Sequence, residues 1–89
     1  MDYTIKCYYD KTLKMSVGKV AAQVGHAVAK VVECYGHMPP HKIIVLEANH
    51  GKFVKMCEDQ TLESYIQYDL GLTEVEPSTP TVIAILEDI

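Results

Sequence analysis

The chain has no arginine, no tryptophan and a single phenylalanine among its 89 residues. All eight of its basic residues are lysines, so no side chain offers the paired hydrogen bonds with which a guanidinium holds a phosphate or a carboxylate. The cysteines are odd in number, widely spaced and outside any C-x-x-C pair: Cys7, Cys34 and Cys57. Their pattern favours neither a disulfide framework nor a zinc site, and it predicts buried or half-buried thiols.

Long hydrophobic runs are also missing. No apolar run approaches the roughly 18 residues that a membrane span needs, and the first residues have neither the basic region nor the apolar block of a signal peptide. We therefore expect a cytoplasmic protein with no membrane partner. The chain lacks a G-x-S-x-G elbow, a P-loop and a G-x-G-x-x-G loop. His37, His41 and His50 are not joined by cysteines or acids at ligand spacing, so we expect no metal.

With 48% hydrophobic and 22% charged residues, the composition is that of an ordinary globular chain. The length allows one domain, residues 1–89, with a single core. Two apolar runs, at 42–48 and 82–86, lack polar alternation, as expected for strands covered on both faces. With strands at 4–9 and 65–68 and two helices, they predict an α/β fold with a mixed, mainly parallel four-stranded sheet.

One of the expected helices is long and the other is short. Ser16 is a good N-cap for the long helix, which runs to residue 34 or 35 and is stopped by the glycine and two prolines that follow. Its apolar stripe should form core and comprises Val20, Val24, Ala27, Val28, Val31 and Tyr35. Gly25 lowers the stability of the helix by up to about 1 kcal/mol. Its presence is explained if another group approaches its backbone closely. Asn49 is the expected cap of the short helix.

A row of polar residues follows another face of the long helix. Lys19, Gln23, His26 and Lys30 recur at helical spacing and begin in the first turn. A cation there is disfavoured by the helix dipole, and its presence is explained if it faces an anion. The row therefore predicts an anion-facing surface, although a solvated helix face would have the same pattern.

A second motif near the C-terminus strengthens the interpretation of the segment that begins the long helix. Residues 13–27 contain the pattern L-K-M-x-x-G-K-x-A-A-Q-x-x-H-A, and residues 69–82 contain D-x-G-x-T-x-x-x-P-x-T-x-T-V. The two motifs, in this order and with a K-x-I-V-L strand between them, resemble the peptidyl-tRNA hydrolase 2 family. The resemblance covers most of the chain and implies the same α/β architecture.

The resemblance implies cleavage of the ester that joins a peptide to the 3′-terminal ribose of tRNA, with release of free tRNA and without a cofactor. Peptidyl-tRNA is then the partner. No cofactor is needed, because hydrolysis of such an ester requires only an activated water and stabilisation of the developing oxyanion. Asp69, acting through Thr73, would orient or activate water, and Thr81 would position the cleaved group. Lys19, with the helix N-terminus, would stabilise the oxyanion or a phosphate. The motif residues expected to contact substrate are Lys14, Ser16, Gly18, Gln23 and His26.

The charge distribution leaves a second function open. The net charge is −4, but residues 1–55 hold all eight lysines and four acids, giving +4, whereas residues 56–89 hold eight acids, giving −8. Val17 and Asp10 stand where the family often carries basic residues, which lowers the basicity near the expected site. The alternative is a non-catalytic relative that binds tRNA or a protein.

The two apolar strands also predict a homodimer. Both faces of the sheet should be buried, but only one long and one short helix are available to cover them. A monomer would leave apolar sheet surface exposed, whereas a two-fold interface would bury it.

Overall fold

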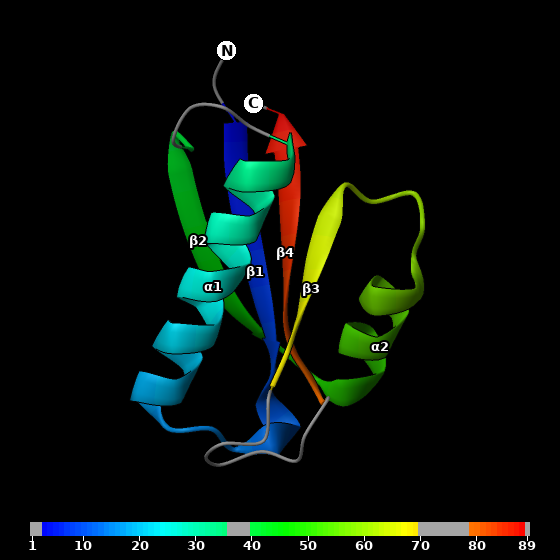
Figure 1. Cartoon of the computed structure of the whole chain (residues 1–89). Helices are drawn as coiled ribbons and strands as arrows, with labels where there is room; N and C mark the ends of the chain where they lie inside the picture. Colours follow the sequence, from blue (N-terminus) through cyan, green and yellow to red (C-terminus); the bar gives the residue numbers. More distant parts are fainter. Residues whose placement is uncertain (1–2, 36–39, 70–78, 89) are drawn as a thin grey trace.

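A computed structural model describes residues 3–35, 40–69 and 79–88 of the chain (Figure 1). The elements lie close to their predicted positions, and the expected α/β class is confirmed. In chain order they are the strand β1 (Tyr3–Asp10), the 3-10 turn η1 (Lys11–Leu13), the helix α1 (Val17–Tyr35), the strand β2 (Lys42–Ala48), the helix α2 (His50–Glu58), and the strands β3 (Ser64–Tyr68) and β4 (Pro80–Asp88).

The four strands form one mixed sheet in the order β2-β1-β4-β3. β1 and β2 are parallel, whereas β4 is antiparallel to both β1 and β3. The sheet is thus mixed, as predicted, but the expectation that it is mainly parallel was wrong. The last strand inserts between β1 and β3 and runs opposite to both of them, which makes two of the three pairings antiparallel.

α1 begins where its cap predicts. The Lys19 backbone N–H donates to Ser16 Oγ at 3.2 Å, and the Val20 N–H donates to the Ser16 carbonyl at 3.0 Å. Such a cap satisfies N–H groups that have no partner within the helix. Gly25 is exposed, and no heavy atom lies within 4 Å of the position that a Cβ would take there. The close approach that would explain this glycine is therefore absent from the described part of the chain.

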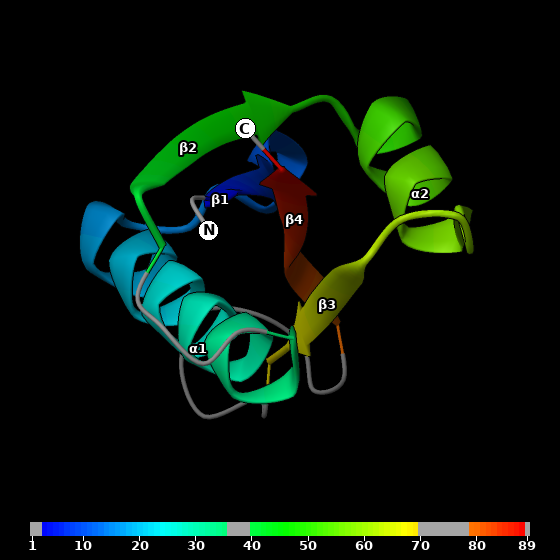
Figure 2. The same cartoon turned by 90° about the horizontal axis from the view of Figure 1, so that it is seen from above.

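The two helices cover opposite faces of the sheet (Figures 1 and 2). Asn49 caps α2 as predicted, since its side chain accepts from the Lys52 N–H at 2.8 Å. Alternate residues of β4 enter the two cores, as its two-sided apolar pattern predicts. The α1 side includes Ile5, Cys7, Ala27, Val31, Val82 and Ala84, and the α2 side includes Ala48, Phe53, Ile83 and Ile85.

β2 has the predicted bounds, but within one chain its apolar side chains are exposed. It lies at the edge of the sheet, and Ile43, Val45 and Leu46 are 47%, 45% and 40% exposed. α1 contacts mainly β4 and β3, so it leaves this edge poorly covered. One chain therefore leaves this apolar strand exposed, as expected if two helices cannot cover both faces of the sheet, and burial of both faces of β2 stays a prediction.

One end of the molecule gathers the starts of both helices, the ends of β1, β2 and β3, and the start of β4 (Figure 1, lower end). The two segments that carry the sequence motifs therefore meet there. Neither helix in the described ranges has the length and hydrophobicity needed to cross a membrane.

Candidate active site

Lys19 and Asp69 form an ion pair between the first turn of α1 and the end of β3. The ammonium of Lys19 donates to Asp69 Oδ1, although the two residues are 50 positions apart in the chain. The side chains are 11% and 2% exposed, respectively. Burial of a complementary pair keeps its electrostatic interaction strong because little water screens it. The expected anion opposite Lys19 is thus a carboxylate of the same chain.

The backbone holds Asp69 at the rim of the sheet. Its N–H donates to the Thr79 carbonyl at 2.9 Å, which ties the end of β3 to the residue that precedes β4. A carboxylate held by its own backbone and by a lysine has little freedom to reorient. The pair therefore presents a fixed charge arrangement at the end where α1 begins.

Thr81 joins this cluster because the ladder between β3 and β4 is irregular. Gln67 pairs with Val82 and Tyr68 pairs with Pro80, so Thr81 is an extra residue on β4, as in a β-bulge. A bulge redirects a side chain that regular alternation would point to the other face. The Thr81 hydroxyl lies 2.5 Å from Gln23 Oε1 and 3.1 Å from the Gln67 carbonyl oxygen.

Gln23 is buried one helical turn after Lys19, at 6% exposure. Residues four apart on a helix are neighbours on one face, so the Lys19 and Gln23 side chains leave α1 in the same direction. The Thr81 hydroxyl donates to the amide oxygen of Gln23. This contact orients the amide, and its NH2 group becomes the part of Gln23 that can donate to a ligand.

The other predicted site residues are placed differently. Ser16 is the exposed N-cap of α1. Lys14, Gly18 and His26 are exposed near or on the first turns of α1, and Lys14 has a left-handed backbone with φ 53°. The polar row of α1 is thus divided into a buried half, Lys19 and Gln23, and an exposed half. Thr73 lies outside the described residues.

A second polar cluster, missed at the sequence level, lies on the α2 side of the same end. The Asp10 side chain is buried and lies 2.7 Å from His50 Nδ1, and it accepts from the Thr12 N–H at 3.0 Å and from the Thr12 hydroxyl at 2.6 Å. Burial alone would raise the pKa of Asp10, but the hydrogen bonds from Thr12 and His50 hold that pKa below its ordinary value of 3.8. Asp10 is therefore a carboxylate that links η1 to the start of α2.

The thiols of buried Cys7 and half-buried Cys57 both have raised pKa values, which disfavours their thiolate forms. Burial raises the pKa of the Cys7 thiol to about 11. The pKa of Cys57 is also raised, mainly by burial and then by the nearby carboxylates of Asp10 and Glu58. Cys34 is exposed, which corrects the expectation of a buried or half-buried thiol there. In the described ranges, no three histidine, cysteine or acidic residues form a group that could hold a metal ion.

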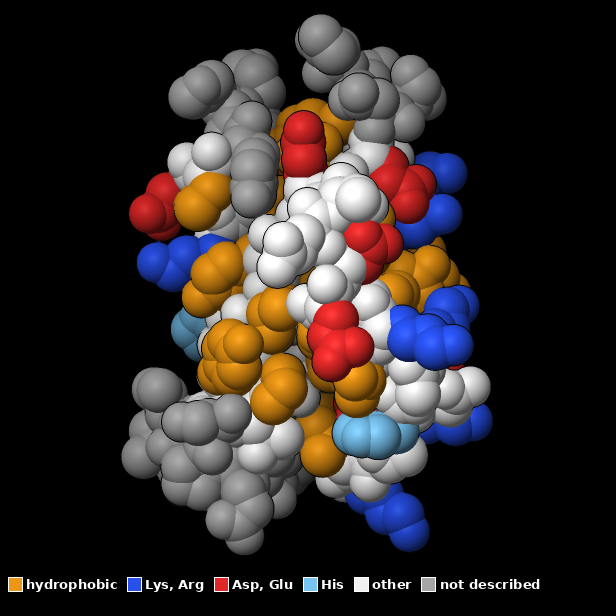
Figure 3. Space-filling view, turned by 90° about the vertical axis from the view of Figure 1, so that its right-hand side faces the viewer, with side chains coloured by type: hydrophobic (Ala, Val, Ile, Leu, Met, Phe, Trp, Pro, Cys, Tyr) orange, Lys and Arg blue, Asp and Glu red, His pale blue; other side chains and the backbone are white. Residues whose placement is uncertain are grey.

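Lysines are unevenly distributed over the surface. Lys6 and Lys30 pair with Glu87 at 3.3 Å and Glu33 at 3.9 Å, respectively. On the face that α2 covers, lysine side chains gather along one edge and at the lower end, the end that holds the cluster of Lys19 and Asp69 (Figure 3). Two exposed lysines, Lys52 and Lys55, lie on α2 itself.

Replacing Thr81 with valine removes the hydroxyl but keeps the shape of the side chain. The variant leaves the buried Gln23 oxygen without its donor, and we expect a loss of about 1–3 kcal/mol in the free energy of unfolding. Turnover should fall about tenfold because the Gln23 amide is no longer held. Urea unfolding and kinetics of Thr81→Val and Thr81→Ser test this. Equal behaviour of the two variants would show that the hydroxyl has no role.

Comparisons with known proteins agree with the motifs. The family model described as "Peptidyl-tRNA hydrolase PTH2" matches residues 7–87. The chain is 38% identical over 87 residues to the peptidyl-tRNA hydrolase of Haloquadratum walsbyi, with 85% of this chain and 78% of the relative covered. It is 34% identical over 89 residues to the peptidyl-tRNA hydrolase of Pyrobaculum aerophilum, with 82% of this chain and 74% of the relative covered.

Proposed function

The chain belongs to the peptidyl-tRNA hydrolase PTH2 family and is a peptidyl-tRNA hydrolase, and we propose that Lys19 and Asp69 form its reaction centre. There the ester between the peptide and the 3′-terminal ribose of tRNA is cleaved, and free tRNA is released. The observation that supports this centre is the buried ion pair between the two sequence motifs.

The pair divides the work of ester hydrolysis. The Asp69 carboxylate orients a water molecule and takes one of its protons as the water oxygen attacks the ester carbonyl. When the tetrahedral intermediate collapses, the bond between the carbonyl carbon and the ribose oxygen breaks, and this proton passes to the departing ribose hydroxyl. The Lys19 ammonium lies beside that carboxylate and stabilises the negative charge that develops on the carbonyl oxygen. Thr73, four positions after Asp69 in the sequence, remains our proposed partner in holding the water.

Gln23 and Thr81 complete the centre. Thr81 is fully buried and its hydroxyl is engaged by Gln23, so we assign it a positioning role through that amide. The amide NH2 of Gln23 is the second donor for the oxyanion or for the ribose. Lys14, Ser16 and Gly18 are exposed at the start of α1 and His26 is exposed in its third turn, and we assign them to contacts with the substrate.

The proposed reaction takes place without a metal ion, because a carboxylate, an ammonium and an amide supply water orientation and charge stabilisation. We place the protein in the cytoplasm, where peptidyl-tRNA is produced. Addition of EDTA to the purified protein should leave turnover unchanged.

Turnover of a defined substrate tests the function itself. Purified protein should release free tRNA from peptidyl-tRNA and from N-acetylaminoacyl-tRNA. Absence of hydrolysis of both substrates would support the rival function, a non-catalytic module that binds tRNA or a protein. The acidic net charge and the absence of arginine are the features that favour that rival.

We also propose that two copies associate through β2. An exposed apolar edge strand invites pairing with another chain, and soluble proteins usually protect such edges. β2 carries Lys42 at one end and Glu47 at the other, and both are exposed. Antiparallel pairing of two β2 strands about a two-fold axis brings the lysine end of each strand beside the glutamate end of its partner.

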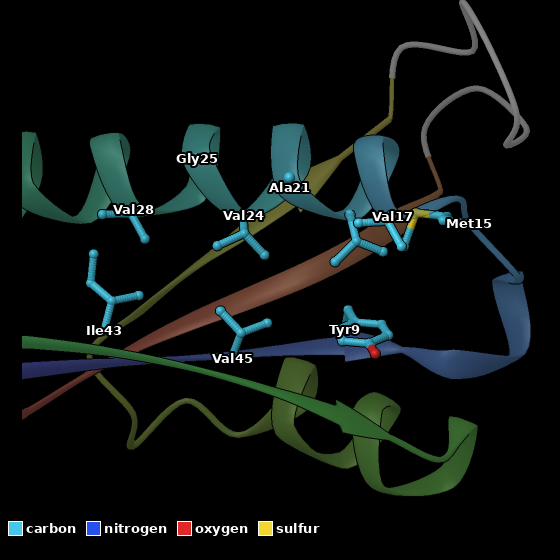
Figure 4. Close-up of a pocket in the computed structure, with 10 residues that line it drawn as sticks. Tyr9, Met15, Val17, Ala21, Val24, Gly25, Val28, Ile43 and Val45 are labelled. Atoms are coloured by element: carbon cyan, nitrogen blue, oxygen red, sulfur yellow. The ribbon is translucent and has the colours of Figure 1, made fainter.

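An apolar groove next to this edge supports the same assembly (Figure 4). It has a volume of about 620 Å³ and lies between α1 and β2, and none of the described residues that line it is charged. The side chains of Val24, Val28, Ile43 and Val45 point toward one another from its two walls (Figure 4). A second copy that continues the sheet at β2 would cover this apolar surface.

Light scattering tests the dimer. At micromolar concentration the protein should have twice its chain mass of 10.0 kDa, and Val45→Lys should give the mass of one chain because it places a charge in the groove. Tyr68→Lys is the matched control, since Tyr68 is similarly exposed, at 49%, on the opposite edge strand. A wild-type protein that stays at 10.0 kDa would contradict the proposal.

A further inference from the structure

Four exposed lysines lie toward the end of the molecule that holds the reaction centre. Three of the eight lysines of the chain pair with carboxylates, whereas none of the other five has an ion pair among the described residues. One of these five, Lys42, begins β2 at the opposite end of the sheet. The other four, which we call the lysine strip, are Lys11 in η1, Lys14 just after it, and Lys52 and Lys55 on α2.

The strip holds the exposed cations nearest to the reaction centre in the described part of the chain. The chain has no arginine, so lysine alone gives it side chains that stay positively charged at neutral pH. The ammonium of Lys19 is engaged by Asp69. Phosphates are neutralised by exposed cations. A nucleic-acid backbone that leaves the reaction centre is therefore attracted by charge toward the strip.

Asp10 fastens the two parts of the strip to one junction. Its carboxylate accepts from the Thr12 N–H and hydroxyl in η1, at 3.0 and 2.6 Å, and lies 2.7 Å from Nδ1 of His50, the first residue of α2. η1 is thus held against the start of α2, and three residues further along the chain α1 begins. The strip therefore leads from the start of α1 around this end of the molecule to α2.

The ammonium of Lys52 is held in place without being neutralised. It lies 5.1 Å from the centre of the Tyr8 ring on β1. The face of an aromatic ring attracts a cation but carries no net charge, so this ammonium keeps its full charge for a phosphate. Lys55 is three positions further along the helix and therefore lies on a neighbouring part of the same helix surface.

Two acids lie near the strip, and neither neutralises it. Asp10 precedes Lys11, but its side chain is 3% exposed and is engaged by its own hydrogen bonds. Glu58 ends α2 one turn beyond Lys55, and no ion pair joins these two residues in the described structure. The exposed charge of the strip is thus that of its lysines as far as the end of α2.

We propose that the lysine strip binds the phosphate backbone of tRNA outside its 3′-terminal nucleotide, while that nucleotide reaches the reaction centre. The inference rests on the proposed function, because it places the rest of the same substrate. A second copy that pairs at β2 would lengthen the sheet at its edge and leave the outer side of α2 open. Lysine contacts to phosphate carry no sequence information, so tRNAs of different sequence should bind with similar affinity.

Binding of labelled tRNA without a peptide, measured by fluorescence anisotropy over a series of salt concentrations, tests the strip. Lys52→Gln combined with Lys55→Gln should raise the Kd about tenfold and lower the slope of log affinity against log salt by about 1–2. The control combines Lys6→Gln with Lys30→Gln, which removes the same charge from lysines that have acidic partners, and should change the Kd by less than about twofold. Equal losses in the two double variants, or no loss in the first, would overturn the proposal.

Kinetics then connect the strip to turnover. The double variant of Lys52 and Lys55 should raise KM for peptidyl-tRNA about tenfold and keep kcat within about twofold of wild type, with its fold confirmed by circular dichroism. A wild-type KM would contradict the proposal. The binding test uses tRNA that carries no ester, so tRNA binding at the strip without hydrolysis would refute the proposed reaction and support the strip, and hydrolysis without a contribution of the strip would do the reverse.

Discussion

Asp69→Asn and Lys19→Met should each lower kcat for peptidyl-tRNA hydrolysis by about a hundredfold or more. In the proposed mechanism, the first change removes the charge that orients water, and the second removes the cation that stabilises the oxyanion. Both side chains are largely buried and paired with each other, so each single variant leaves one buried charge without its partner. We therefore also expect each to lose about 3–5 kcal/mol in the free energy of unfolding.

A double variant separates the effect on kcat from the effect on stability. Lys19→Met combined with Asp69→Asn removes both charges and should recover much of the lost stability, while kcat stays low. Lys30→Met is the control, because Lys30 lies on the same helix but is exposed. Near wild-type turnover in any folded variant of Lys19 or Asp69 would remove that residue from the mechanism.

The start of α1 shows how much local sequence determines. Ser16 has the side chain that caps a helix, and α1 begins at the next residue. A cap and an apolar period act within a few residues, so they are visible in the sequence. The helix dipole also made Lys19 conspicuous, and its partner is indeed an anion. The sequence did not predict that this anion is Asp69, 50 positions away, because the family motifs assign both residues to the site without pairing them.

Features that depend on strand order were beyond the sequence. The apolar run of β2 has the composition of a covered strand, yet its place at the sheet edge leaves it exposed. Nothing within the run distinguishes an edge strand that pairs with another molecule from a central strand. Likewise, the irregular ladder that turns Thr81 toward Gln23 depends on the pairing of β3 with β4.

The contact between Asp10 and His50 on the α2 side likewise could not be predicted from the sequence. At the sequence level Asp10 only lowered the local basicity, and His50 only entered a weak metal hypothesis. In the fold, the two side chains meet across 40 positions because β1 ends where α2 begins. The only local signal was the hydroxyl residue Thr12, two positions after Asp10, since aspartate commonly accepts from the backbone two residues on.

Asp10→Ala should cost about 2–4 kcal/mol in the free energy of unfolding, because it removes an N-cap and the charged acceptor of two further hydrogen bonds. His50→Ala is the matched control. It removes a single partner on an exposed side chain and should cost clearly less. Urea unfolding at neutral pH measures both differences.

The contribution of Asp10 to the free energy of unfolding should change with pH in a definite direction. The pKa of Asp10 is lower in the folded protein than its ordinary value of 3.8, so the unfolded chain binds this proton more tightly. The contribution of Asp10 to stability is therefore complete above that ordinary value and is lost as the pH falls through the lower folded pKa. The gap in unfolding free energy between wild type and Asp10→Ala should narrow on acidification below about pH 4. A gap that stays constant to pH 2 would mean that the carboxylate charge contributes nothing, and that the Asp10 contacts stabilise the end of the sheet by packing alone.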